Sequence, residues 1–275
     1  MSIDPSTLSQ PFIEAVKHLM AKGTLPNDLS SAQLRQIDAA IRRQSVFSAN
    51  TAMEHYLEEI RGVVESIINP ATGVSKDRET ASNPHGLVTT GLSPATARAK
   101  LRDALTKFGY TPGEGIEGTI KDLSSDARLN LVINTNTQLA QGAGKFVQSN
   151  VDEDVVDLYP AWELVRYEDR EKPRNWQQRW RIAAQVAGDP KAAAALELHG
   201  RMAALKSSGI WDALGDGAGG YDDTLGNPYP PFAFNSGMWC DDVSRDDAVD
   251  LGLISADETA HPARFNLDDL FSTPS

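Results

Sequence analysis

The chain has 275 residues, of which 40% are hydrophobic, and its formal net charge is −12. This length and composition predict a folded protein of one or two domains, and the lack of a long apolar run excludes a membrane-spanning helix. The acidic charge disfavours non-specific binding to nucleic acid, because an acidic surface repels phosphates.

The single cysteine and the first residues bear on the compartment in which the chain folds. Cys240 has no second cysteine to pair with, so an internal disulfide cannot form. Residues 1–12, "MSIDPSTLSQPF", lack the basic region and the apolar core of a signal peptide. Both features favour a reducing cytoplasm as the place of folding.

Residues 1–68 predict a helical arm. Apolar side chains recur at helical spacing in residues 11–23, 30–47 and 48–68. Such a stripe needs a surface to pack against, which makes the last segment a candidate contact with a partner protein. The candidate partner-binding residues on this stripe are Tyr56, Ile60, Val63 and Ile67.

Residues 69–92 predict a linker. The segment is rich in Gly, Pro, Ser, Thr and Asn and has no apolar period. His85 lies between Pro84 and Gly86 and is interpreted as a solvated loop residue. This linker is the candidate boundary between the arm and a domain that covers residues 93–275.

That domain begins with two predicted helices. The first follows Ser93 as its cap and Pro94 in its first turn. The second covers residues 126–150 and contains the polar insertion "NTNT" in its apolar stripe. Because buried amides need hydrogen-bond partners, Asn134 or Asn136 is expected to hold a neighbouring backbone group.

After residue 150 the pattern becomes mixed. Residues 162–167 are compatible with a strand or a helical turn, and helices are predicted over residues 176–188 and 189–211 and after Ser244. Residues 215–238 read as Gly/Pro-rich coil. The sequence therefore predicts a helix-dominated α+β fold: a helical arm, then a compact mixed domain with a long Gly/Pro-rich loop and an extended acidic C-terminal tail.

No catalytic or metal-binding signature emerges from the residue spacing. The candidate metal ligands lack the spacing of known zinc motifs. A cysteine nucleophile would need His199 or His261 as its base, and the carboxylate of Asp241 disfavours the thiolate of Cys240. We therefore expect no cofactor, no metal and no catalytic residue. The ligands considered were His199, Cys240, Asp241, Asp242 and His261.

The segment "NPYPPFAFNSGMWC", residues 227–240, combines prolines with large aromatic side chains. The first interpretation is structural: prolines fix its path while Tyr229, Phe232, Phe234 and Trp239 fill a pocket of the same fold. Docking of a partner is the second interpretation, with Tyr229, Phe232 and Phe234 as the contacts. Catalysis is the third.

Two alternatives to a structural role stay open. An enzyme could use a cleft lined by the region 222–242 together with Arg166, Glu168, Arg170 and Arg174. A nucleic-acid-binding module could use "KPRNWQQRWR", residues 172–181, as a stacking platform. For the latter segment we favour a helix with Trp176 and Trp180 buried and with Arg179 and Arg181 in solvent.

The order of short segments resembles the phage Mu-type minor head proteins, a family also described as phage head morphogenesis proteins. The resemblance extends from about residue 42 to residue 254. It differs at two places: Asn175 and Trp176 follow Pro173 and Arg174 where many relatives have a histidine, and the lone Cys240 stands where relatives often have two cysteines. The segments that carry it are "AAIRRQSVFSANTAMEHYLEEIRGVVESII", "TARAKLRDAL", "RLNLVINTNTQLAQGAGKF", "YPAWELVRYEDREKPR", "GRMAALKSSGIWDAL" and "NPYPPFAFNSGM".

This resemblance implies a non-enzymatic virion component that takes part in head assembly. Its expected partners are the portal protein and/or the major capsid or scaffold protein, with no membrane and with incidental contact with packaged DNA. The expected location is the host cytoplasm during assembly and then the virion, in the capsid interior or at the portal vertex.

Overall fold

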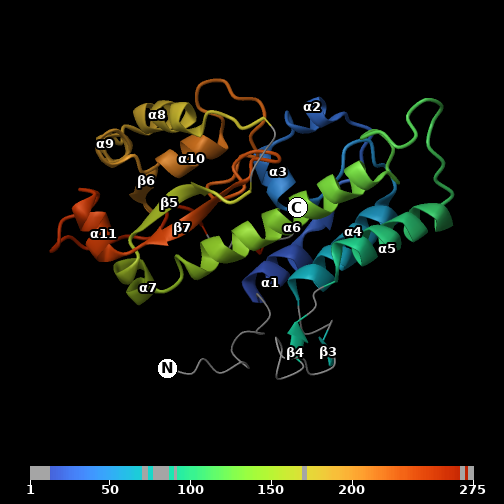
Figure 1. Ribbon diagram of the computed structural model, residues 1–275, viewed down its shortest axis with the longest axis horizontal. Helices are drawn as coiled ribbons and strands as arrows, with labels where there is room; N and C mark the ends of the chain where they lie inside the picture. Colours follow the sequence, from blue (N-terminus) through green and yellow to red (C-terminus); the bar gives the residue numbers. More distant parts are fainter. Residues whose placement is uncertain are drawn as a thin grey trace. The chain divides into compact units, whose positions relative to one another are not determined.

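The computed structural model describes residues 13–69, 74–76, 87–89, 92–168, 172–266 and 270–271. Within these ranges helices dominate, and short strands form small separate sheets (Figure 1). The predicted helix-dominated α+β class is therefore confirmed.

The chain divides into two compact units, each built from segments that are distant in the sequence. Unit 1 comprises Met1–Leu34, Gln44–Gly144 and Phe271–Ser275, and unit 2 comprises Arg35–Arg43 and Lys145–Leu270. This division differs from the expected arm, linker and domain. The physical reason is that the helices on both sides of residues 69–92 share one apolar core, so the chain does not separate there.

Unit 1 is built around two helices that pack against each other, α4 and α5, and the first part of the long helix α6. Helix α5 begins where predicted, because Ser93 accepts a hydrogen bond from the backbone N–H of Thr96 at 3.2 Å and Pro94 follows it. The elements of unit 1 are α1 (Ile13–Ala21), β1 (Gly23–Thr24), α2 (Ser31–Leu34), β2 (Ser45–Val46), α4 (Glu54–Ile68), β3 (Val74–Lys76), β4 (Leu87–Thr89), α5 (Pro94–Lys107) and α6 (Asp126–Gln148) up to Gly144.

Two predictions for the N-terminal half need correction. The predicted helix over residues 30–47 is interrupted, because Asp38 accepts the backbone N–H of Ala40 at 2.7 Å and starts a new helix, α3 (Ala39–Arg43). The predicted linker contains an antiparallel pair, in which β3 and β4 place Val74 opposite Thr89. Most of that segment, His85 included, lies outside the described residues.

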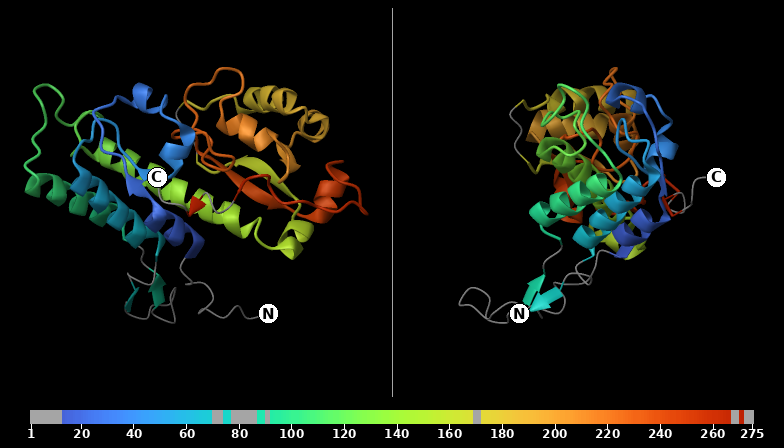
Figure 2. Two further views of the ribbon diagram at one scale, coloured as in Figure 1. Left: turned by 180° about the vertical axis from the view of Figure 1, so that it is seen from behind. Right: turned by 90° about the vertical axis from the view of Figure 1, so that its right-hand side faces the viewer.

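Unit 2 places helices beside a three-stranded antiparallel sheet of order β6-β5-β7. Helices α8, α9 and α10 pack together next to this sheet (Figure 1, Figure 2). The elements of unit 2 are α3, the end of α6 from Lys145, α7 (Glu153–Leu158), β5 (Ala161–Arg166), α8 (Trp176–Ala187), α9 (Pro190–His199), β6 (Ala203–Leu205), α10 (Ile210–Gly215), β7 (Met238–Val243) and α11 (Arg245–Asp250).

The helix predicted over residues 189–211 is instead α9, β6 and α10. Gly200 ends α9 with a φ of 72°, and the chain then turns back to pair with β5. The cap of α9 is as predicted, because Asp189 accepts the backbone N–H of Ala192 at 2.9 Å. Helix α11 also begins as predicted, after Ser244. Strand β7 was not predicted.

Candidate functional site

The aromatic–proline loop, residues 227–237, supplies part of the core of unit 2. The side chains of Tyr229 and Phe232 are buried among the aromatic residues of the surrounding elements. Ring centroids lie 5.0 Å apart for Tyr229 and Phe146, and 5.9 Å apart for Phe232 and Trp211 in a stacked pair. Trp211 in turn lies 5.4 Å from Trp180 and edge-on to it. The contacts of Tyr229 and Phe232 therefore agree with the structural interpretation of this loop, whereas Phe234 and Trp239 are only half-buried.

Three charged side chains hold the chain on one side of this loop to α8. Asp223 accepts hydrogen bonds from Arg179 at 2.8 Å and 3.0 Å, and Arg174 lies 2.6 Å from the same carboxylate. Arg174 also donates to the carbonyls of Phe234 and Asn235. We call Arg174, Arg179 and Asp223 the arginine–aspartate cluster.

The electrostatics of this cluster favour the ionised carboxylate. Burial alone would raise the pKa of Asp223, but the hydrogen bonds and charge of Arg179, with the charge of Arg174, outweigh it and hold that pKa below its ordinary value. The Arg179 guanidinium also lies 4.0 Å above the ring of Tyr221. The cluster therefore holds Asp223, and through Arg174 the carbonyls of Phe234 and Asn235, in place.

Helix α3 is held against the other side of this region. Arg42 donates to the carbonyl of Thr224 at 3.3 Å, and Arg43 donates to the carbonyl of Gly226. Gly226 has a φ of 74°, and a Cβ atom at this position would lie 2.2 Å from the Cβ of Ala39. A glycine is therefore required here by both the backbone angle and the close approach of α3.

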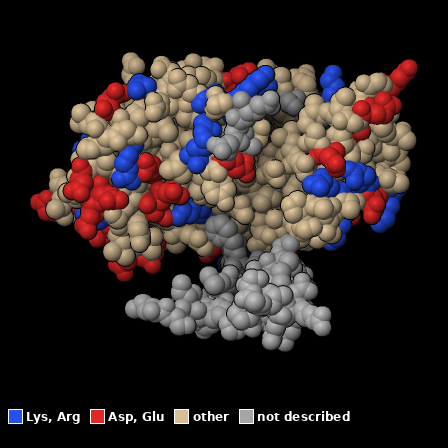
Figure 3. Space-filling model, in the orientation of Figure 1, with Lys and Arg blue, Asp and Glu red and all other residues tan. Residues whose placement is uncertain are grey.

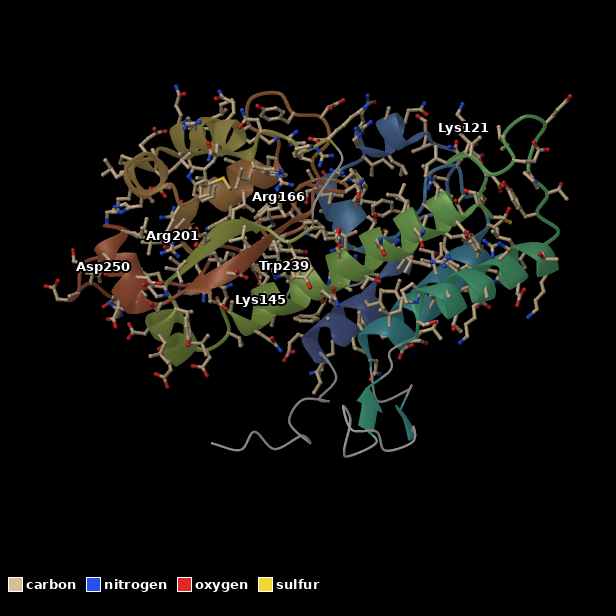
Figure 4. All side chains as sticks on the ribbon, in the orientation of Figure 1. Lys121, Lys145, Arg166, Arg201, Trp239 and Asp250 are labelled. Atoms are coloured by element: carbon tan, nitrogen blue, oxygen red, sulfur yellow. The ribbon has the colours of Figure 1, made fainter. Side chains whose placement is uncertain are left out.

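A second polar group, which we call the lysine–aspartate network, lies on the buried face of the sheet. Asp242 accepts a hydrogen bond from the indole N–H of Trp162 at 3.1 Å and pairs with Lys145, which reaches toward β7 from α6 (Figure 4). The ammonium of Lys206 lies 3.4 Å from Asp242 and donates to the carbonyl of Ser149 at 3.1 Å. Burial lowers the pKa of Lys206, Asp242 raises it in part, and Lys145 lowers it further.

Cys240 is buried in β7, opposite Leu164 of β5. Burial raises the pKa of its thiol, and the charges of Asp241 and Asp242 raise it further, so the thiol stays protonated. His199 and His261 are exposed, in contrast to the buried sulfur. Within the described ranges, no group of three or more His, Cys, Asp and Glu side chains is placed to hold a metal ion.

The candidate partner-binding residues are placed in the cores of the two units. In α4, Tyr56, Ile60 and Val63 are buried in the core of unit 1, and Ile67 is half-buried beside it. The assignment of these side chains to a partner is corrected, because α1 and α5 pack against α4 and its apolar stripe lies in the core of unit 1. In the loop, Tyr229 and Phe232 are buried, and Phe234 is half-buried. Buried side chains cannot serve as docking contacts in this conformation.

The side chains proposed for an enzyme come from the end of β5 and the segment that follows it. Arg166 is exposed at the end of β5, Glu168 is half-buried, and Arg170 lies outside the described residues. Arg174 does meet the 222–242 region, but it meets it through the closed pairing with Asp223. Both oxygens of that carboxylate already accept from arginine.

The segment proposed as a stacking platform for single strands has its aromatic residues inside the fold. Trp176 and Trp180 are buried, as the helical interpretation predicted. The prediction that Arg179 lies in solvent is wrong, because Arg179 is buried and pairs with Asp223. Arg181 is exposed, as predicted, and pairs with Glu197 at 2.6 Å. Buried indoles cannot stack on bases.

Sequence reasoning missed the lysine–aspartate network and the role of α3. A signal for the first existed: Lys206 follows the apolar run "AAL", and a lysine in a buried stretch needs a carboxylate. By contrast, Asn136 was anticipated, and its amide donates to the carbonyls of Val132 at 2.9 Å and Phe47 at 3.4 Å.

Comparison with known proteins adds no relative: no family model, no curated protein and no solved structure matches the chain. Among the helices that the structure describes, none is long and apolar enough to cross a bilayer.

Proposed function

We propose that the chain is a minor head protein of a Mu-type bacteriophage, a structural protein that binds the portal or the inner capsid during head assembly. Its partners are the portal protein and/or the major capsid or scaffold protein. It acts in the host cytoplasm during assembly and then stays in the virion.

This proposal rests on where the segments that resemble the family lie in the structure. Three of them, residues 159–174, 200–214 and 227–238, are distant in the sequence and meet in the core of unit 2. Their aromatic side chains fill the interior, and the arginine–aspartate cluster fixes the loop. Proteins that share a fold keep their core-forming segments in the same order along the chain. The shared order therefore supports a resemblance that extends over the whole fold.

The enzyme alternative has less support. A catalytic carboxylate or base needs a free lone pair or proton facing the substrate. Asp223 accepts from Arg179 through both oxygens and also pairs with Arg174. The Cys240 thiol is buried and protonated. These groups hold structure in the conformation observed.

The proposal is tested by removing the gene from a phage or prophage that carries it and purifying the particles. We expect heads to fail in assembly or DNA retention, and the tagged wild-type protein to restore them and to co-purify at low copy number. Complementation with Arg166→Ala and Glu168→Ala should restore heads equally well. A protein that is absent from purified, infectious particles would contradict the proposal.

A further inference from the structure

The short helix α7 carries an exposed apolar stripe. Val151, just before the helix, and Leu158 and Tyr159 at its end are 67%, 61% and 43% exposed. Val155 is half-buried between them, and Val155 and Leu158 share one face of α7, with Val151 and Tyr159 flanking the two ends of the helix. Val156, on another face of the same helix, is buried and fixes α7 to unit 2.

Acidic side chains border this stripe. Asp152, Glu153 and Asp154 are exposed in the first turn, and within the described ranges no Lys or Arg pairs with them. Asp157 is exposed and pairs with Arg245 at the start of α11, which brings the acids of α11 to the same side. Figure 3 shows Asp and Glu side chains gathered over α7 and α11.

We propose that this stripe and its acidic border form a docking surface for a basic amphipathic segment of another protein. The apolar face of that segment would cover Val151, Leu158 and Tyr159, and its Lys or Arg residues would meet Glu153 and Asp154. The inference stands on α7 alone, so it holds whether or not the chain is a minor head protein.

The charge pattern selects this occupant over a second copy of the chain. A second copy of the chain would bring the same acids to the surface, and like charges disfavour a symmetric contact. The complementary charge is therefore expected on a partner of a different kind.

The test measures the binding of a fluorescein-labelled helical peptide of leucine and lysine to the full chain by fluorescence anisotropy. A peptide of the same composition, permuted so that it has no apolar face, is compared with it. We expect the amphipathic peptide to bind more tightly, because the permuted peptide offers charge but no matching apolar surface. Equal binding of the two peptides would overturn the proposal in favour of general attraction to an acidic protein.

Variants localise the binding. Leu158→Ser should weaken it by about tenfold or more, because the complex would lose the burial of an exposed leucine side chain against the peptide. Leu198→Ser should leave it unchanged, because Leu198 is 77% exposed on α9 and lies outside the stripe. Paired Glu153→Gln and Asp154→Asn should also weaken binding, whereas paired Glu114→Gln and Glu117→Gln in unit 1 should not.

Three further results of these measurements bear on the proposed docking surface. If Leu158→Ser lowers the melting temperature, the charge variants, which leave Val156 in place, give the answer by themselves. If wild type and all variants bind alike, the surface is not on α7 and the proposal is wrong. If light scattering shows a dimer of wild type that Leu158→Ser dissolves, a second copy occupies the stripe and the proposed partner class is wrong.

Discussion

Buried cations in this protein differ in how they are neutralised. Arg179 is buried against the carboxylate of Asp223, and Lys206 is buried near that of Asp242. Lys22, at the end of α1, is buried and forms no ion pair with a described residue. Burial lowers the pKa of Lys22 to about 7.

This shift predicts a pH-dependent stability. Because the folded pKa of Lys22 lies below its unfolded value, the unfolded chain binds the extra proton between about pH 7 and about pH 10.5, and stability rises with pH in that window. Lys22→Met should therefore raise the free energy of unfolding by about 2 to 5 kcal/mol near pH 7 or below. The gain should shrink as the pH approaches 10. Urea denaturation of both proteins across this range checks it, and a gain independent of pH would contradict the assignment.

The arginine–aspartate cluster predicts a cost for removing its carboxylate. Asp223→Asn leaves Arg179 buried without a counter-charge and should lower the free energy of unfolding by about 2 to 4 kcal/mol at neutral pH. Because the folded pKa of Asp223 is depressed, this contribution is present above the unfolded pKa near 4 and is lost as the pH falls through the folded value.

The matched control is Asp222→Asn, which removes a charge from the exposed neighbouring residue. In thermal unfolding, the melting temperature of Asp223→Asn should be lower than that of Asp222→Asn at neutral pH. The two melting temperatures should converge at acidic pH. Equal stability of the two variants at neutral pH would show that the cluster does not hold the loop.

At the scale of single residues, the sequence predicts burial better than pairing. The burial of Trp176, Trp180 and Cys240 follows from helical spacing and residue type. The pairing of Arg179 with Asp223 spans 44 positions, and nothing in local spacing selects that carboxylate from the other acids of an acidic chain. Similarly, Tyr56 and Ile60 were recognised as an apolar stripe, but the sequence does not say whether the covering surface belongs to the same chain.

Helix α3 and the loop that contains Gly226 are linked by close contact between backbones. Gly226→Ala should be strongly destabilising, because it adds a Cβ atom 2.2 Å from that of Ala39 and also strains a φ of 74°. Gly220→Ala, at a φ of 82° in open space, should cost only the backbone strain of about 1 to 2 kcal/mol.

A double variant separates the clash from the strain. Ala39→Gly removes the opposing Cβ atom, so it should restore part of the stability lost in Gly226→Ala when both changes are present. Thermal unfolding of the four proteins of this cycle gives the coupling. Strict additivity would mean that α3 does not pack against Gly226 in solution.

Elements with strong caps were predictable, and elements made by pairing were not. Ser93, Asp189 and Ser244 begin α5, α9 and α11 as their sequence signals predict. Gly200 was available as a stop signal, but the alanine-rich run before it favoured a continued helix. Strand β7 alternates its burial along "MWCDDV", yet it follows a proline-rich loop and exists because β5 offers it a partner.

The acidic charge of the whole molecule and the burial of Trp176 and Trp180 predict weak binding to nucleic acid. Titration of the chain with single-stranded poly(dT) should leave the tryptophan fluorescence unquenched at low salt, because Trp176 and Trp180 cannot reach the bases. Quenching that weakens steeply as salt rises would contradict this and would revive the nucleic-acid-binding alternative.

The division of the whole molecule could not be read from composition. The linker-like segment 69–92 has the residue types of a boundary, but the helices on each side of it pack in one core. The actual boundary falls inside α6, where continuous helical spacing gives no sign of it. Local pattern therefore predicts the class of fold, whereas the grouping of elements depends on contacts between distant segments.

The placement of α3 in unit 2 has a consequence for synthesis on the ribosome. Arg42 leaves the exit tunnel 182 residues ahead of Thr224, whose carbonyl it binds. Everything from Gln44 to Gly144 is made in between and belongs to the other unit. During synthesis, residues 35–43 therefore emerge long before the segment that binds them. A chain that terminates before the aromatic–proline loop would lack the carbonyl groups to which Arg42 and Arg43 donate.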